Sequence, residues 1–201
     1  MSELVLGGST EYFDKVFEDN LKERRILING EINADCIEKV VLPILDFNRQ
    51  DKYLEQLQKK PILLMLSTNG GDVTTGMTII DTIVNSSTPI YGLVLDMAYS
   101  MGGLLLLACH KRYCFKHGTV LIHDGSINSG TTSGAKFKDL NNFLNETEER
   151  IKKFVLEKSK MTEELYDQKY GSEFYMYPEK AKELGIIEYI IGEDCKLSDI
   201  L

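Results

Sequence analysis

Residues 90–109 read IYGLVLDMAYSMGGLLLLAC, and this stretch predicts a buried strand, a tight turn and a buried helix in immediate succession. The apolar run over 90–95 lacks alternation, which is typical of a strand in a parallel sheet covered on both faces. Residues 102–109 are almost wholly apolar, so we expect a helix that is buried on every side. Ser100 stands between the two elements, at the N-terminus of the helix.

The rest of the chain repeats this alternation of apolar strands and amphipathic helices. Strands separated by helices of ten to fifteen residues predict crossover units and a mainly parallel α/β sheet. The helix predicted over 134–160 differs, because its length of about 40 Å exceeds the width of a domain of this size. Part of it must project and contact a partner, which favours an oligomer. The other expected elements are strands at 25–29, 61–67, 112–115, 120–123 and 186–191, and helices at 33–47, 74–84, 162–168 and 178–184.

Composition and charge exclude several classes of protein. A net charge of -8 and a pI near 5.0 disfavour a nucleic-acid partner, which requires clustered Lys and Arg. The four cysteines lack Cys-x-x-Cys spacing, so we expect free thiols and no metal site. No run approaches the ~20 apolar residues of a membrane helix, and 1–18 lacks the pattern of a signal peptide. We therefore expect a soluble protein of the cytoplasm, or of an organelle stroma or matrix, with no membrane partner.

The turn at 98–102 (AYSMG) places a serine where negative charge is stabilised. Free backbone N–H groups and the helix dipole attract an anion to a helix N-terminus. The N–H of Met101 is therefore a candidate donor of an oxyanion hole, as in other strand–turn–helix serine nucleophiles. The alternative interpretation makes Ser100 a plain N-cap and the following glycines a packing device.

A second signal is the glycine pair Gly70-Gly71, in a turn predicted over 68–72 after the strand at 61–67. Glycines at the end of a strand let the backbone approach a ligand and present N–H groups to it. The alternative is a simple connection between a strand and the next helix.

A third signal is His123, at the end of the strand predicted over 120–123. The other two histidines, His110 and His117, lie among charged residues and are interpreted as solvated. Ligands of open α/β sheets bind at the carboxyl edge of the strands. Ser100 and His123 both lie at that edge, so they form a candidate nucleophile–base pair.

Three segments resemble, in order and spacing, the hallmark segments of the ClpP-type peptidases: STNGGDVTTGM (67–77), DMAYSMGGLLLLA (96–108) and VLIHDG (120–125). The resemblance implies the ClpP/crotonase fold, in which repeated β-β-α and βαβ crossover units form a compact head and the long helix forms a handle. Segment 1–20 would be an N-terminal axial segment, and 21–201 would be one peptidase domain.

The resemblance also implies roles for particular residues. The implied catalytic residues are Ser100 as nucleophile, His123 as general base and Glu173 as the third member, where the family has Asp. The implied oxyanion-hole residues are Gly70 and Met101, and the implied substrate-binding residues are Gly71, Gly125, Ser126 and Ile127. Glu can orient an imidazole as Asp does, and Asp167 and Asp124 are the alternatives for this role.

The resemblance further implies a homo-oligomer of two stacked heptameric rings, a tetradecamer that encloses a chamber. An ATP-dependent AAA+ unfoldase of the Clp type would feed it unfolded polypeptides, and no cofactor is implied. Two departures from the family pattern bear on assembly: Gly171-Ser172 stands where many members have an Asp-Arg pair that bridges the rings, and Asp124-Gly125 replaces Gln-Pro. We consider three hypotheses: an active serine endopeptidase, a weakly active or inactive ring subunit that partners an active paralogue, and a crotonase-type acyl-CoA enzyme.

Overall fold

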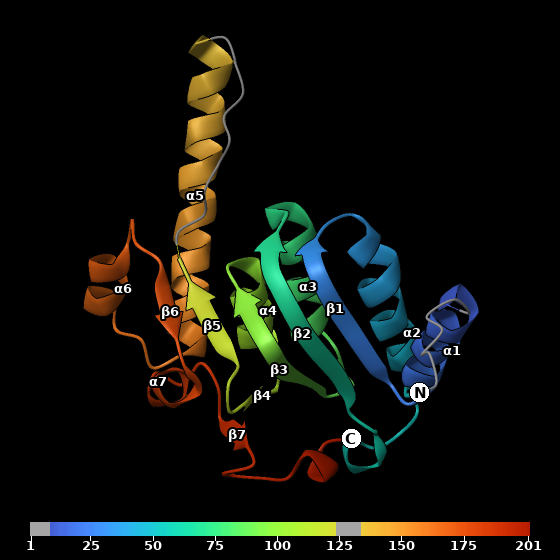
Figure 1. Cartoon of the computed structure of the whole chain (residues 1–201). Coiled ribbons are helices and arrows are strands. Elements are labelled where there is room, and N and C mark those ends of the chain that lie inside the picture. Colours follow the sequence, from blue (N-terminus) through green and yellow to red (C-terminus); the bar gives the residue numbers. More distant parts are fainter. Residues whose placement is uncertain (1–8, 124–133) are drawn as a thin grey trace, which may run out of the picture.

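The structure is a computed structural model that describes residues 9–123 and 134–201 (Figure 1). Within these residues, seven strands form one sheet, and the order β1-β2-β3-β4-β7 is parallel throughout. Strand β5 pairs with β3 in parallel, and β6 pairs with β5 in the antiparallel sense. The predicted mainly parallel α/β sheet is confirmed.

The strands and helices follow the predicted order, with two additions. The strands are β1 (Arg25–Ile32), β2 (Ile62–Gly71), β3 (Ile90–Tyr99), β4 (Lys111–Phe115), β5 (Thr119–Ile122), β6 (Phe174–Met176) and β7 (Tyr189–Ile191). The helices are α1 (Ser9–Lys22), α2 (Leu42–Gln50), α3 (Val73–Val84), α4 (Met101–Ala108), α5 (Gly134–Lys158), α6 (Glu163–Lys169) and α7 (Pro178–Glu183), and a π-helical segment (Ile37–Val41) precedes α2. Neither α1 nor β6 was predicted.

Strand β2 differs from its prediction at its carboxyl end. We expected a turn over 68–72, but β2 continues through Gly71 and pairs there with Glu31 and Ile32 of β1. Gly71 permits this pairing because it has no side chain. A Cβ atom at this position would overlap the Ile32 carbonyl oxygen. The glycine pair therefore belongs to the sheet edge, and α3 begins only two residues later.

The first halves of β2 and β3 are largely buried on both faces, as their unbroken apolar runs predicted, whereas β1 alternates between buried and exposed residues. Helices α2, α3 and α4 lie on one face (Figure 1), where they pack against Ile62, Leu64 and Leu66 of β2. Leu63 faces the other way and packs with residues of the C-terminal segment. All eight residues of α4 are buried, which confirms the helix predicted to be enclosed on every side. Each of its leucines contributes roughly 1.5–3 kcal/mol by leaving water.

Strand β3 is shared by two neighbours, and this sharing positions the candidate site. Its first half, around Leu93, pairs with β4, whereas its second half, from Met97 to Tyr99, pairs with β5. The β5–β6 pair therefore lies beside the carboxyl end of β3.

Helix α5 extends well beyond the rest of the domain (Figure 1), as its predicted length required. Ile151 and Val155 bury its second half against the head, whereas the Phe143 side chain is 63% exposed. Arg112 fixes its end by donating from Nη1 to the Lys158 carbonyl at 2.8 Å. In the described part of the chain, no helix has the length and apolarity needed to cross a lipid bilayer.

Candidate active site

Ser100 occupies a strained turn between β3 and α4. Its φ is +54°, and Arg24 is the only other non-glycine residue of the described chain with a positive φ. Such a conformation costs of order 1–3 kcal/mol and persists only where surrounding contacts enforce it. Here the Ser100 N–H donates to the Leu121 carbonyl at 3.0 Å, and its carbonyl accepts from the Gly103 N–H at 3.0 Å.

The Ser100 hydroxyl does not cap the helix that it precedes. The residue stands at the N-cap position of α4, yet its side chain makes no capping hydrogen bond. An ordinary N-cap serine accepts from an N–H of the first turn. The plain N-cap interpretation therefore does not explain Ser100, and the side chain, which is partly exposed, keeps its hydrogen-bonding capacity for a ligand.

Gly70 lies directly against the Ser100 turn. A Cβ atom on Gly70 would lie 2.8 Å from the Ser100 Cβ and from the Tyr99 carbonyl oxygen, and 3.1 Å from the Met101 nitrogen. Its φ of +96° is a second reason for glycine at this position. The structure thus brings Gly70 and Met101 together beside Ser100. In this arrangement the Gly70 N–H donates to Thr68 Oγ1 at 3.0 Å.

The start of α4 reaches β2 and β5 because its first residues are small. Gly102 packs on the Thr68 methyl group, and Gly103 packs on the Leu121 carbonyl. The Met101 side chain fills the space left by Gly76 of α3. The Met101 N–H is at the first position of the helix, where no intrahelical acceptor exists. This geometry suits a donor to an anion formed at Ser100.

His123 follows β5, the neighbour of β3 at its carboxyl end. Tyr99 is paired with Leu121, so His123 lies two residues beyond the point where β5 holds the Ser100 turn. The ring lines a narrow pocket with side chains of the surrounding elements, which are Ile122, Met161, Tyr166, Lys169, Tyr170 and Phe174. Among residues 9–123 and 134–201, no hydrogen bond joins His123 to Ser100.

His123 and Glu173 each lie one residue beyond the paired parts of β5 and β6. The antiparallel register sets Val120 against Met176 and ends with Ile122 against Phe174, so both residues stand at the same end of this strand pair. The Glu173 side chain is exposed, and it raises the pKa of Tyr175 through a hydrogen bond with the phenol.

Asp167 and Asp124 are the alternatives to Glu173 as the third catalytic residue. Asp167 is engaged elsewhere, because its Oδ1 accepts from the Lys152 ammonium at 2.7 Å. Asp124 lies outside the described residues, as do the predicted substrate-binding residues Gly125, Ser126 and Ile127. Gly71, the remaining predicted substrate-binding residue, borders a groove between α3 and α5 that is lined by both apolar and polar side chains.

The strand order explains why these residues meet. Gly70, Ser100, His123 and Glu173 belong to β2, β3, β5 and β6 or lie at their ends, and these four strands are consecutive neighbours in the sheet. Sequence reasoning missed Thr68, Tyr170 and Tyr175, whose contacts depend on this pairing. In the part of the chain that the structure describes, no three His, Cys, Asp or Glu side chains are grouped to hold a metal ion, and all four cysteines are free thiols.

Comparison with known proteins agrees with this geometry. The family model of the Clp protease matches residues 8–194. Over 187 residues the chain is 27% identical to the ATP-dependent Clp protease proteolytic subunit 2 of Corynebacterium efficiens. The matched region covers 92% of this chain and 90% of that protein. The fold and the site define an α/β protein of the ClpP type. The chain belongs to the Clp protease family, and these matches favour the two Clp hypotheses over a crotonase-type enzyme.

Proposed function

We propose that the chain is a serine endopeptidase, the proteolytic subunit of a Clp-type chambered protease. Ser100 is the nucleophile, His123 the general base and Glu173 the residue that orients His123. The observation that carries the proposal is the Ser100 turn itself. A strained serine that does not cap its helix lies against Gly70 and beside the Met101 N–H, at the edge of the sheet where β5 delivers a histidine.

The proposed reaction proceeds through an acyl-enzyme. His123 removes the proton from the Ser100 hydroxyl while Oγ attacks the peptide carbonyl, and the carbonyl oxygen becomes an oxyanion. The N–H groups of Met101 and Gly70 stabilise this charge, for which the Gly70 N–H exchanges Thr68 Oγ1 for the oxyanion. His123 then protonates the leaving amine as the C–N bond breaks. Water, deprotonated by His123, hydrolyses the ester and restores Ser100.

The proposed setting of this reaction is a chamber formed by two stacked heptameric rings. Helix α5 projects from the head and offers a surface for contact between rings (Figure 1). A Clp-type AAA+ unfoldase would deliver unfolded polypeptides in the cytoplasm. The substrate backbone would pair with Gly71 and with the segment Gly125, Ser126 and Ile127, and such main-chain recognition suits a degradative enzyme of broad specificity.

One specific observation favours a second candidate function, a weakly active ring subunit that partners an active paralogue. The Glu173 carboxylate is exposed and interacts with Tyr175, and in the described residues His123 makes no hydrogen bond to Ser100. A triad in this state has its nucleophile in place but lacks an oriented base. A partner ring would then either orient His123 or supply the active sites itself.

Hydrolysis of short fluorogenic peptides by assembled rings separates the two functions. We expect wild-type protein to be active and Ser100→Ala and His123→Ala each to lose activity by about 10⁴-fold or more. Ser198→Ala removes an exposed serine hydroxyl in the C-terminal segment. This variant is the matched control and should retain full activity. Inactive wild-type rings that gain activity only with an active paralogue would establish the second function instead.

A further inference from the structure

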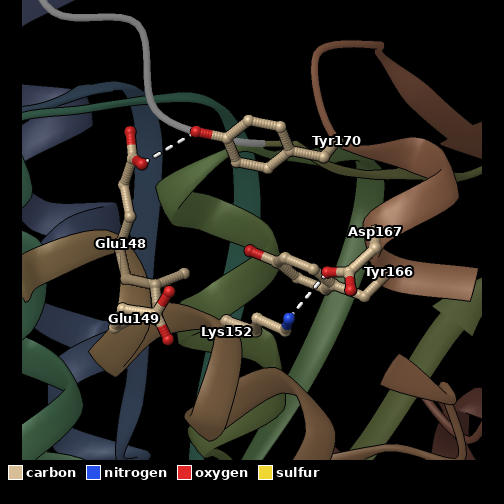
Figure 2. A pocket seen from close by; sticks show the side chains of 7 residues that line it. Glu148, Glu149, Lys152, Tyr166, Asp167 and Tyr170 are labelled. Atoms are coloured by element: carbon tan, nitrogen blue, oxygen red, sulfur yellow. Dashed lines mark hydrogen bonds and ion pairs between the residues drawn. The ribbon is translucent and has the colours of Figure 1, made fainter. Parts of the chain in front are cut away.

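Two polar links connect α5 to α6 and to the turn that follows it. The Tyr170 hydroxyl donates to Glu148 Oε2 at 2.8 Å, and Lys152 forms ion pairs with Asp167 at 2.7 Å and with Glu163 at 3.0 Å. Figure 2 shows Tyr170 and Glu148 directed at one another across a pocket of about 270 Å³, with the Lys152–Asp167 pair below them. Lys152 and Asp167 are 15 positions apart in the chain, and Tyr170 and Glu148 are 22 positions apart.

A closed turn after α6 connects Tyr170 to Glu173. The Tyr170 N–H is bonded to the Tyr166 carbonyl at 2.9 Å, so Tyr170 is fixed to the end of α6. Gly171 then takes a φ of +76°, which ends the helix. Ser172 closes the turn with its N–H and its hydroxyl, which both donate to the Lys169 carbonyl. Glu173 follows this closed turn immediately.

The Tyr170 side chain also borders the candidate base. It lines the same narrow pocket as His123, and Phe174, which pairs with Ile122 just before His123, completes that side. Tyr170 is thus in contact with the surroundings of His123 and only three residues from Glu173, while its hydroxyl is bonded to α5.

We propose that Tyr170 is a positioning residue for His123 and Glu173, held in place for this role by the hydrogen bond from its hydroxyl to Glu148 of α5. The inference rests on the proposed peptidase function. Because Tyr170 and Glu148 belong to the same chain, this bond fixes the end of α6 against α5. The closed turn at Gly171 and Ser172 then leads directly to Glu173.

The test compares Tyr170→Phe, which removes only the hydroxyl, with two variants of its partner. Glu148→Ala removes the acceptor, whereas Glu148→Gln keeps an acceptor oxygen and should restore wild-type behaviour. We expect Tyr170→Phe and Glu148→Ala each to lower kcat about tenfold with KM within twofold, because a base displaced by a fraction of an ångström is less effective. The double variant should lose no more than either single one. Tyr177→Phe, which removes an exposed phenol hydroxyl, is the matched control.

A second readout examines His123 without using catalysis. The rate at which diethyl pyrocarbonate modifies His123, measured by peptide mass spectrometry, should change at least threefold in Tyr170→Phe and Glu148→Ala, with exposed His117 as internal reference. Unchanged His123 modification in both variants would overturn the proposal. If wild-type hydrolysis proves independent of Ser100, the proposed function fails, and the modification rates still decide whether Tyr170 positions His123.

Discussion

The two halves of the candidate site differ in how firmly the surrounding structure holds their residues. On the nucleophile side, Ser100 is held by backbone hydrogen bonds at both its N–H and its carbonyl, and Gly70 packs against it. On the base side, His123 follows the short strand β5, and Glu173 precedes the three-residue strand β6 with its carboxylate exposed.

This difference indicates which half of the proposed site depends on fewer contacts. Helix α4 is buried, and the Ser100 turn before it is held by backbone hydrogen bonds. His123 and Glu173 stand at the ends of the short strands β5 and β6, and Tyr170, three residues before Glu173, is bonded to Glu148 of α5. We therefore expect changes in this half to leave the Ser100 turn in place.

Among variants that keep both Ser100 and His123, the strongest expected effect is on the nucleophile half. Gly70→Ala places a Cβ atom 2.8 Å from the Ser100 Cβ, so we expect peptide hydrolysis to fall by about 100-fold or more, as when an oxyanion donor is lost. Gly30→Ala is the matched control, because Gly30 has a φ of +92° and nothing within 4 Å of the added atom. It should cost about 1–2 kcal/mol of stability and little activity. Equal activities in the two variants would break the comparison.

A smaller effect is expected on the base half. Glu173→Ala should lose most of the activity, about 100-fold at most, because the imidazole loses its orienting carboxylate but Ser100 and the oxyanion donors remain. Glu173→Asp should retain activity. Glu179→Ala, an exposed carboxylate in the first turn of α7, controls for surface charge. Steady-state hydrolysis rates decide the matter, and equal rates for wild type and Glu173→Ala would remove Glu173 from the triad.

The smallest effect concerns the other end of β3 and should leave both halves intact. Burial lowers the pKa of His110, and its Nδ1 accepts the Ile90 N–H at 3.1 Å, which requires the neutral ring. This contribution to stability is present above the ordinary pKa of about 6.5 and is lost as the pH falls below it. Between pH 7.5 and pH 5.5 wild type should lose slightly more unfolding free energy than His110→Gln, and the difference should be small because His110 is exposed. Denaturant titration measures this difference, and parallel curves would contradict it.

The core of the fold was predictable because it depends on local composition. The apolar run before Ser100 and the leucine run after it leave few alternatives to a buried strand and a buried helix, and the structure places α4 within one residue of its predicted bounds. Strand β2 was predicted to end too early, because two glycines favour a turn locally and only the pairing with Ile32 shows that they continue the strand.

The site was predictable in part for the same kind of reason. Carboxyl ends of neighbouring parallel strands meet at one edge, which brings Gly70 to Ser100. The environment of Glu173 was not predictable, because it depends on the short antiparallel strand β6 and on the packing of α6 against α5. Tyr170 and Glu148 are 22 positions apart, and no spacing in the sequence connects them.

The central claim is that Ser100 is an activated nucleophile, and a fluorophosphonate probe tests it most directly. Assembled protein, checked by native mass spectrometry, is incubated with the probe, digested and mapped by peptide mass spectrometry. The account predicts one adduct per chain on Ser100, formed at least 100-fold more slowly in His123→Ala. Assembled rings with no adduct on Ser100, or with labelling that His123→Ala leaves unchanged, would contradict it.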